Sequence, residues 1–354
     1  MSRYWSPLVE QLSPYVPGEQ PGRETFIKLN TNELPWPPSP RVLEAVHGVG
    51  GGSLRLYPDP DNSRLREAWA KREGLLPEQV FLGNGSDEVL AHVFRALFDP
   101  RRPVLFPDIT YSFFPVYCAL HGLKYQTIPL AENFGIELGA YPAANGGVIF
   151  PNPNAPTGMA LPRAEIEALL AANRESVVVV DEAYVDFGAE TCLPLVNHYD
   201  NLLVVQTLSK SRGLAGLRVG AAFGQAPLIE GLRRVKNSFN SYPLGRLAET
   251  GAVAALEDEA WFLSSCARLT GNRTSLFEGL LSLDFQVLPS MANFLLARHP
   301  RHKGRALSAG LRERGILVRH FQLPRISDHL RISVGAQEHC HALLEGLGKI
   351  LQEE

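Results

Sequence analysis

Five short apolar runs constrain the fold of this chain more than any other feature. They cover residues 104–106, 148–150, 177–180, 202–205 and 219–223. A run that is apolar at every position belongs to a strand that is covered on both faces. Helix-like stretches separate several of the runs, for example residues 162–173, where Ile166, Leu169 and Leu170 form an apolar stripe. The pattern predicts an α/β domain with a largely parallel sheet between two layers of helices.

The chain is long enough for a second domain, because a single core stops growing near 250–300 residues and this chain has 354. Residues 1–45 are rich in proline, which disfavours helices and central strands, so we expect an extended arm that also joins the smaller domain. We expect residues 46–245 to form the large domain. We expect residues 246–354 to form a smaller α+β domain, since two long helical stretches, three short strands and a closing helix follow one another there.

Charge and apolar content restrict the partners and the location. The net charge of -3 argues against a nucleic-acid or membrane-surface partner, so we expect a small-molecule ligand. The first residues lack the features of a signal peptide, and no apolar run approaches the ~18 residues of a membrane span, which predicts a cytoplasmic protein. His339, Cys340 and His341 are adjacent in sequence, but neighbours do not share a helix face, so we expect no metal there.

Lys210 lies in the stretch QTLSKSRGLAGLRVG, residues 206–220, directly after an apolar run. An ammonium held at the end of a buried strand tends to lose its proton, and a neutral amine is a nucleophile. The alternative interpretation is a surface lysine in a loop between a strand and a helix.

Asp181 directly follows the four valines of residues 177–180, at the expected carboxyl end of a central strand. Ligands of open α/β sheets bind at that edge, and a buried carboxylate needs a cationic or protonated partner. Tyr184 could direct its hydroxyl into the same crevice. The alternative is an aspartate that caps the next element.

Two further loops could hold a ligand. Gly83, Gly85, Ser86 and Asp87 form a glycine-rich entry to a helix, where free N–H groups and the helix dipole suit an anion. An ordinary helix cap would explain the same residues. The loop FPNPNAPTG, residues 150–158, could place asparagine amides against a ligand, although by itself it is only a well-formed turn.

Together with Ser209 and Arg218, these groups supply an amine, a buried acid, an aromatic hydroxyl and an anion site at strand ends of one sheet. Pyridoxal phosphate needs this set of groups. The chain resembles the fold-type I pyridoxal-phosphate aminotransferases, and among them the histidinol-phosphate aminotransferase family. The motifs LNTNELPWPPSP, YPDPD, GNGSDE, PNPNAPTG, DEAYVDF, SKSRGLAGLRVG and LRISVG carry the resemblance over nearly the whole length.

The resemblance implies a role for each matching residue. Lys210 would be the Schiff-base lysine and the base that moves a proton, Asp181 would keep the pyridine nitrogen protonated, and Tyr184 would bond the phenolic oxygen. Tyr111 would stack on the ring. The phosphate would be held by Gly85, Ser86, Asp87, Ser209 and Arg218, with Tyr57 reaching in from a second subunit, so that a homodimer is implied.

One position departs from the family pattern. The residue before Pro-Thr-Gly is commonly an asparagine that bonds the phenolic oxygen, but here it is Ala155. Either Asn154 or Asn152 reaches that oxygen, or Tyr184 acts alone; we retain Asn154 as a cofactor-binding candidate.

For the substrate, the resemblance assigns Arg331 and Arg319 to the anionic groups, with Tyr15 and Asn32 as helpers. A guanidinium suits both the carboxylate of glutamate or 2-oxoglutarate and the phosphate of histidinol phosphate. The expected activity is amino transfer between these compounds. The alternatives are an aminotransferase for aromatic or other amino acids, a related threonine-phosphate decarboxylase-like enzyme, or a catalytically silent cofactor-binding regulator.

Overall fold

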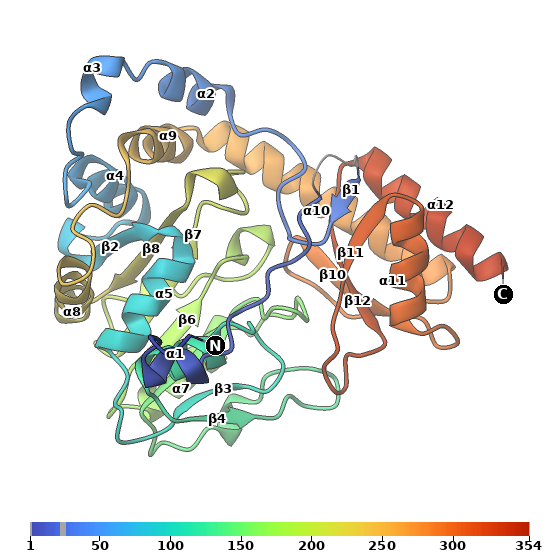
Figure 1. Ribbon diagram of the computed structural model, residues 1–354, viewed down its shortest axis with the longest axis horizontal. Helices are drawn as coiled ribbons and strands as arrows, with labels where there is room; N and C mark the ends of the chain where they lie inside the picture. The colour runs from blue at the N-terminus through green and yellow to red at the C-terminus, as the bar shows by residue number, and fades with distance from the viewer. Residues whose placement is uncertain (1, 22–25, 354) are drawn as a thin grey trace.

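The computed structural model describes residues 2–21 and 26–353. In this part of the chain the strands form two sheets, which divide the molecule into a large lobe and a small lobe (Figure 1). The sheet of the large lobe has the order β2-β8-β7-β6-β5-β3-β4. Its strands are β2 (Val80–Asn84), β3 (Val104–Pro107), β4 (Tyr125–Ile128), β5 (Gly147–Pro151), β6 (Val178–Asp181), β7 (Leu202–Thr207) and β8 (Val219–Gly224).

The direction of the strands brings several loops to one edge of the large sheet. Strands β4, β3, β5, β6 and β7 are mutually parallel, and β8 runs antiparallel to both β7 and β2. Strand β2 therefore points the same way as β7, whereas β8 begins where the others end. The residues after β2, β6 and β7 and the residue before β8 consequently lie at the same edge.

Both faces of this sheet are buried, which explains the continuous apolar runs. Val178 and Val180 of β6 belong to one core cluster, together with Trp69 and Ile166, whereas Val179 belongs to another with Val93 and other residues on the opposite face. The expected doubly covered, largely parallel sheet is therefore confirmed.

Helices cover the large sheet on its two faces. They are α4 (Ser63–Glu73), α5 (Gly85–Ala96), α6 (Phe114–His121), α7 (Arg163–Ala172), α8 (Ala226–Asn237) and α9 (Arg246–Glu257). The short helix α3 (Gly51–Leu54) buries none of its residues and lies at the outer edge of the molecule in Figure 1. Short 3-10 turns lie at η1 (Pro77–Gln79), η2 (Leu138–Ala140), η3 (Val185–Phe187), η4 (Leu193–Leu195) and η5 (Ala215–Leu217). Ala252 and Val253 of α9 pack in the same core cluster as Val178 and Val180 of the large sheet.

The small lobe is built on a sheet with the order β1-β11-β12-β10-β9. Its strands are β1 (Ile27–Leu29), β9 (Gln286–Val287), β10 (Phe294–Arg298), β11 (Ile316–His320) and β12 (His329–Ser333), and its helices are α10 (Glu259–Ser282), α11 (Gly304–Glu313) and α12 (Gln337–Gln352). Leu295 and Ile332 of the sheet pack with Leu276 of α10 and Leu343 of α12. These elements form a second core.

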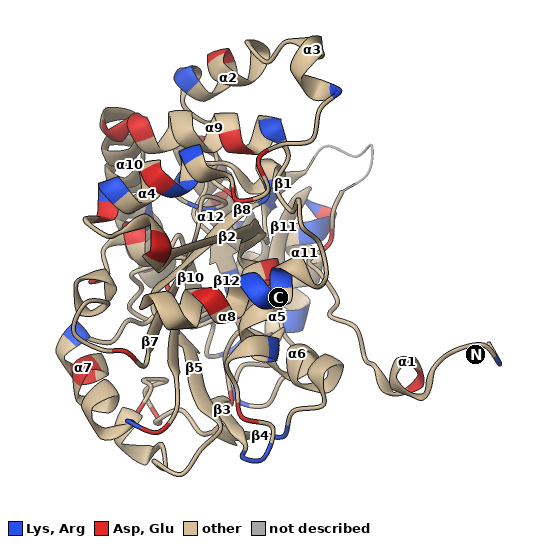
Figure 2. Cartoon of the chain, turned by 90° about the vertical axis from the view of Figure 1, so that its left-hand side faces the viewer, with Lys and Arg blue, Asp and Glu red and all other residues tan. Residues whose placement is uncertain are grey.

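The N-terminal segment is less extended than its prolines suggested. It contains α1 (Pro7–Gln11), strand β1, which pairs parallel with β11, and α2 (Pro40–His47). Pro7 and Pro40 occupy the first position of their helices, where the missing N–H costs nothing, and Ser6 and Ser39 cap the two helices. The expectation of a wholly extended arm is therefore wrong, although α1 buries none of its residues and projects from the body in Figure 2.

Figure 2 also shows basic and acidic residues interspersed over the chain. None of the helices in the described residues is both long and apolar enough to cross a bilayer.

Candidate active site

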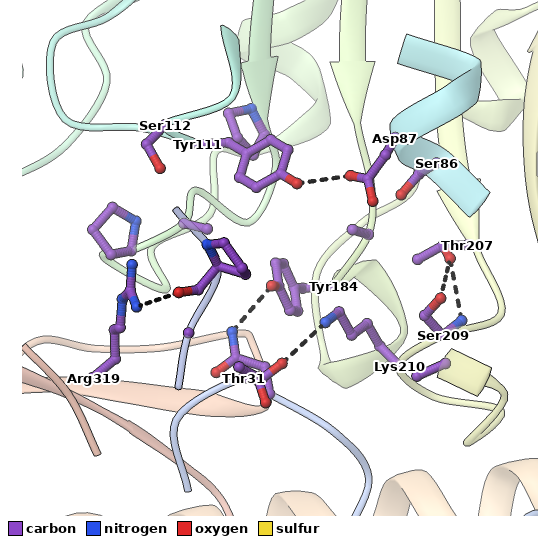
Figure 3. A pocket seen from close by; sticks show the side chains of 18 of the residues that line it. Thr31, Ser86, Asp87, Tyr111, Ser112, Tyr184, Thr207, Ser209, Lys210 and Arg319 are labelled. Atoms are coloured by element: carbon purple, nitrogen blue, oxygen red, sulfur yellow. Dashed lines mark hydrogen bonds between the residues drawn. The ribbon is translucent and has the colours of Figure 1, made fainter. Parts of the chain in front are cut away.

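A cavity of about 360 Å³ lies between the edge of the large sheet and the small lobe (Figure 3). Residues from both lobes and from the N-terminal segment line it. Those predicted as site residues are Tyr15, Asn32, Ser86, Asp87, Tyr111, Asp181, Tyr184, Ser209, Lys210, Arg218, Arg319 and Arg331. The structure thus brings together groups from eight separate stretches of the chain.

Lys210 follows the end of β7 and points into this cavity (Figure 3). Its Nζ donates to the Thr31 carbonyl at 3.4 Å and lies 5.5 Å from the centre of the Tyr184 ring. The amine forms no ion pair with a described residue, so it is available to a ligand that enters the cavity.

Asp181 ends β6 and is 4% exposed. Its carboxylate accepts a hydrogen bond from the Ala183 backbone N–H at 3.1 Å. Burial raises the pKa of this carboxyl to about 7, and the Asp87 charge adds to that rise, whereas the Ala183 bond and Lys210 oppose it. No cationic side chain of the described residues lies within salt-bridge distance, so the acid lacks the partner that a buried carboxylate requires.

Tyr184 stands beside the amine and the acid. Its hydroxyl accepts a hydrogen bond from Asn32 Nδ2 at 3.0 Å, and its ring meets Phe294 edge-on at 5.0 Å. Asn32 in turn accepts from the Ser333 hydroxyl at 2.8 Å. The tyrosine is therefore held in place by the small lobe, with its hydroxyl proton left to donate to a ligand.

The backbone around the start of α5 forms a cradle for an anion. Gly85 adopts a φ of +81°, and a Cβ on Gly220 would lie 2.4 Å from the Ser86 amide nitrogen. Arg218 pairs with Asp87 at 2.9 Å, and Ser209 accepts from Thr207 at 2.9 Å. A helix N-terminus, an arginine and hydroxyls are a donor set that suits a phosphate.

Replacing Gly220 with alanine should weaken cofactor binding by about 10- to 100-fold, because the new methyl group would overpack the cradle by about 1–3 kcal/mol. An absorbance titration with pyridoxal phosphate measures this. Gly216→Ala, in the adjacent turn η5, is the matched control, since a Cβ there meets nothing within 4 Å. Equal dissociation constants for the two variants would show that the close approach is not needed.

Tyr111 lies over this side of the cavity. Its hydroxyl donates to Asp87 at 2.7 Å (Figure 3), and burial, followed by the Asp87 charge, raises the pKa of the phenol. The group therefore stays protonated, and its ring is fixed by one short hydrogen bond.

These residues fit pyridoxal phosphate. The cavity contains an amine for the aldehyde, an unpartnered buried acid for the ring nitrogen, a phenol for the phenolic oxygen and a cradle for the phosphate. The fit rests on the donor set and on the buried acid in particular, because no cationic side chain of the described residues pairs with Asp181.

The structure does not bring Asn154 into the cavity. Its side chain donates to the Ile109 carbonyl at 3.0 Å and accepts from Thr110 at 3.1 Å, while Asn152 is bonded to both backbone groups of Leu161. Ala155 lines the cavity instead. The assignment of Asn154 is therefore corrected, and Asn32 is the asparagine that contacts Tyr184.

Tyr57 also lies outside the cavity of its own chain. It is 79% exposed, stacks on Tyr242 with ring centres 4.7 Å apart, and its carbonyl accepts from Arg246 at 2.9 Å. The side chain is thus held on the surface in a defined position.

Arg331 and Arg319 lie opposite each other on β12 and β11. Arg331 donates to the Asn30 carbonyl at 2.9 Å, and its Nε has no hydrogen-bond partner among the described residues. Burial lowers the pKa of its guanidinium. Arg319 donates to the Pro17 and Val16 carbonyls, both at 3.3 Å, and Tyr15 stacks on Phe113 nearby. Two guanidinium groups therefore face one end of the cavity, where they could bind an anion.

Some cavity residues were not predicted from the sequence. Thr207, Thr110 and Ser112 contribute hydroxyls from strand ends and loops. Their positions beside Ser209 and Tyr111 could have suggested them, because residues next to a strand-end ligand group share its edge.

Comparison with known proteins identifies the family of this chain. Residues 24–347 match the family model for aminotransferase class I and II. The chain is 61% identical over 347 residues to histidinol-phosphate aminotransferase 2 of Thiobacillus denitrificans, covering 98% of this chain and 97% of that relative. It is 60% identical to histidinol-phosphate aminotransferase 1 of Bradyrhizobium diazoefficiens, covering 99% and 100% of the two chains.

Solved structures show the same fold. Histidinol-phosphate aminotransferase from Sinorhizobium meliloti, in complex with pyridoxal-5'-phosphate, matches with a TM-score of 0.91 and 25% identity, over 100% of this chain and 99% of the other. A mutant aspartate aminotransferase from Thermus thermophilus matches with a TM-score of 0.83 and 21% identity, over 99% and 100%. The chain therefore belongs to the class I and II aminotransferases and, within them, to the histidinol-phosphate aminotransferase family.

Proposed function

We propose that this chain is a pyridoxal-phosphate-dependent enzyme that transfers an amino group between L-histidinol phosphate and 2-oxoglutarate, giving imidazole acetol phosphate and L-glutamate. The observation that carries the proposal is the shared cavity, in which an unpaired amine and an unpartnered buried acid face two arginines of the small lobe. The names of the relatives at 60–61% identity support the choice of substrate.

Residues of the large lobe would hold the cofactor. The N-terminus of α5, Ser209 and Arg218 would bind its phosphate, Tyr184 would donate to its phenolic oxygen, and Asp181 would pair with its ring nitrogen. The bound cofactor would supply an electron sink for the bonds at the α-carbon of the substrate. Asp181 would keep the ring nitrogen protonated, because a carboxylate in this buried position gains most from a cationic neighbour.

Lys210 would move the proton. Its Nζ would hold the cofactor through the aldehyde group, and the same nitrogen would move a proton at the α-carbon of the substrate. Thr31 O and the Tyr184 ring keep the lysine side chain aimed into the cavity. The arginine pair would bind the phosphate of histidinol phosphate in one half-reaction and a carboxylate of 2-oxoglutarate in the other.

We also propose that the enzyme acts as a homodimer in which Tyr57 completes the phosphate site of the partner. This is supported by the exposed but fixed Tyr57 side chain and by the exposed apolar residues Leu54, Leu56 and Phe239. We also propose a cytoplasmic location.

Replacing Arg319 with alanine should lower kcat/KM for histidinol phosphate by about 10- to 100-fold, because a charge-assisted hydrogen bond contributes ~1.5–3 kcal/mol. Single-turnover loss of the visible absorbance of the cofactor measures the reaction with histidinol phosphate, phenylalanine and aspartate separately. We expect histidinol phosphate to react most efficiently with the wild type, and its advantage over phenylalanine to shrink in the variant.

Arg298→Ala is the control, because Arg298 lies on the exposed end of β10 and bonds Gln286. A wild type that prefers phenylalanine would identify an aromatic aminotransferase, and one that reacts with none of these amines would identify a silent cofactor-binding protein. An unchanged rate for Arg319→Ala would overturn the phosphate assignment alone.

A further inference from the structure

The loop between β11 and β12 reaches across from the small lobe to the large lobe. Arg325, in this loop, has a φ of +67° and donates to the Leu130 carbonyl at 2.9 Å and to the Ala131 carbonyl at 2.5 Å. In Figure 1 the end of this hairpin meets the loop that follows β4. One guanidinium therefore spans two consecutive carbonyls of the other lobe, with a geometry that a planar fork of donors favours.

Further contacts fix the same guanidinium. It pairs with Asp108 at 3.7 Å and lies 5.0 Å from the centre of the Phe134 ring. Asp108 also accepts from the Leu130 backbone N–H at 2.9 Å, so the acid and the carbonyl that Arg325 contacts are themselves joined. Arg325 is 34% exposed and Asp108 29%, so the ion pair is only partly screened by water.

The residues next to Arg325 anchor the loop by apolar contact. Ile326 is fully buried and belongs to the core of the large lobe, although its loop connects two strands of the small lobe. Phe134 also meets His329 of β12 edge-on at 5.5 Å. Polar and apolar contacts thus converge at the end of the β11–β12 hairpin.

The contact of Arg325 joins two segments of the chain that carry predicted site residues. Asp108 lies three residues before Tyr111, and Arg325 lies between Arg319 and Arg331 on the same hairpin. The contact therefore connects the segment that carries the ring-facing tyrosine to the hairpin that carries both anion-binding arginines. Either segment could shift relative to the other only by breaking the bonds of Arg325.

We propose that Arg325 is a positioning residue for the substrate anion: by tying the β11–β12 hairpin to residues 108–134, it sets the reach of Arg319 and Arg331 into the cavity. The inference rests on the proposed function, because it assumes that these arginines bind the anionic end of the substrate. Arg325 itself does not line the cavity, so it acts through the hairpin.

Replacing Arg325 with alanine should raise KM for histidinol phosphate by about 10-fold while kcat changes by less than about threefold, since small misplacements of binding groups cost ~10- to 100-fold. The dissociation constant of inorganic phosphate for the holoenzyme, measured by calorimetry, should rise by a similar factor. Arg325→Lys keeps the charge but loses the fork, so it should restore part of the loss.

Hydrogen exchange of the holoenzyme gives a readout that does not need turnover. Amides in residues 131–135 and 326–329 should exchange faster in Arg325→Ala than in the wild type, because these segments lose their connection. Arg301→Ala is the matched control: this exposed arginine of the same lobe pairs with Asp284 at 3.7 Å and should leave all three measurements unchanged.

A rise in exchange with KM and phosphate affinity unchanged would overturn the proposal, because the contact would then contribute only to stability. A loss of cofactor binding in Arg325→Ala would overturn it as well. If histidinol phosphate proves not to be the substrate, the phosphate titration and the exchange measurement still test the positioning role of Arg325, so that the two failures can be told apart.

Discussion

Replacing Lys210 with alanine should lower the rate of amino transfer by on the order of 10⁶-fold, the scale of loss when an enzyme loses a nucleophile that acts together with its neighbours. Among the described residues that line the cavity, Lys210 is the only lysine. Its amine can both bond to an aldehyde and move a proton. The protein should also lose the visible absorbance band that the wild type shows with pyridoxal phosphate. Stopped-flow kinetics and a spectrum of the purified variant measure the two effects.

A second variant keeps this test independent of folding. Lys210→Arg preserves the positive charge, but a guanidinium stays protonated and is a poor nucleophile, so it should be as inactive as the alanine variant. Lys349→Ala is a control on an exposed helix position, where the lysine pairs with Glu345. An active, coloured Lys210→Ala enzyme would contradict the assignment of the cofactor lysine.

Replacing Asp181 with asparagine should lower kcat by about 10²- to 10⁴-fold, because a buried ion pair that loses one partner costs ~3–5 kcal/mol. The change preserves the shape of the side chain and removes the charge that would hold a proton on the ring nitrogen. Single-turnover kinetics with saturating cofactor separate this effect from weaker binding.

Glu182→Gln is a matched control, because the neighbouring carboxylate is equally buried but bonds to Thr191, Cys192 and Gln206 instead of facing the cavity. It should keep kcat within about threefold of the wild type, as expected of a residue that does not contact the reacting atoms. Similar losses of kcat in the two variants would show that burial of charge, and not contact with the cofactor, explains the effect.

Asp181 should also give the cofactor-free protein a pH-dependent stability. Burial raises the pKa of its carboxyl from 3.8 to about 7, so between these values the folded protein holds a proton that the unfolded chain has released. The free energy of unfolding therefore decreases as the pH rises through this range. Urea unfolding of Asp181→Asn should show a smaller decrease, since asparagine does not titrate.

The sequence predicts those parts of the site that follow from strand ends. Asp181 comes directly after one buried run, and Lys210 follows the end of the next strand. Because the carboxyl ends of parallel strands meet at one edge, their proximity could be inferred. The antiparallel direction of β8 could not, because residues 219–223 are apolar throughout in either direction. That direction is nevertheless what brings Arg218 to the same edge.

Other features depend on contacts between distant residues. The loop containing Asn154 looks suited to a ligand, but Ile109 and Thr110 take up its amide, and nothing in the local sequence indicates this. The contact of Arg325 with Leu130 joins residues 195 positions apart, and such pairs leave no periodic signal. In the N-terminal segment, prolines favour an extended chain by their number, but two of them occupy the first position of a helix.

The hydrogen bond between Asn32 and Ser333 has a consequence for the order of assembly. The backbone N–H of Asn32 donates to the Ser333 hydroxyl at 2.9 Å across 301 residues, and β1 pairs with β11 just beside it. During synthesis, β1 and Asn32 can form these contacts only after nearly the whole chain has left the ribosome. Long-range pairing of this kind forms late because the intervening chain must first be ordered. The wall of the cavity that contacts Tyr184 is therefore completed only when the last strand arrives, so a nascent chain that already contains Lys210 and Asp181 still lacks a finished site.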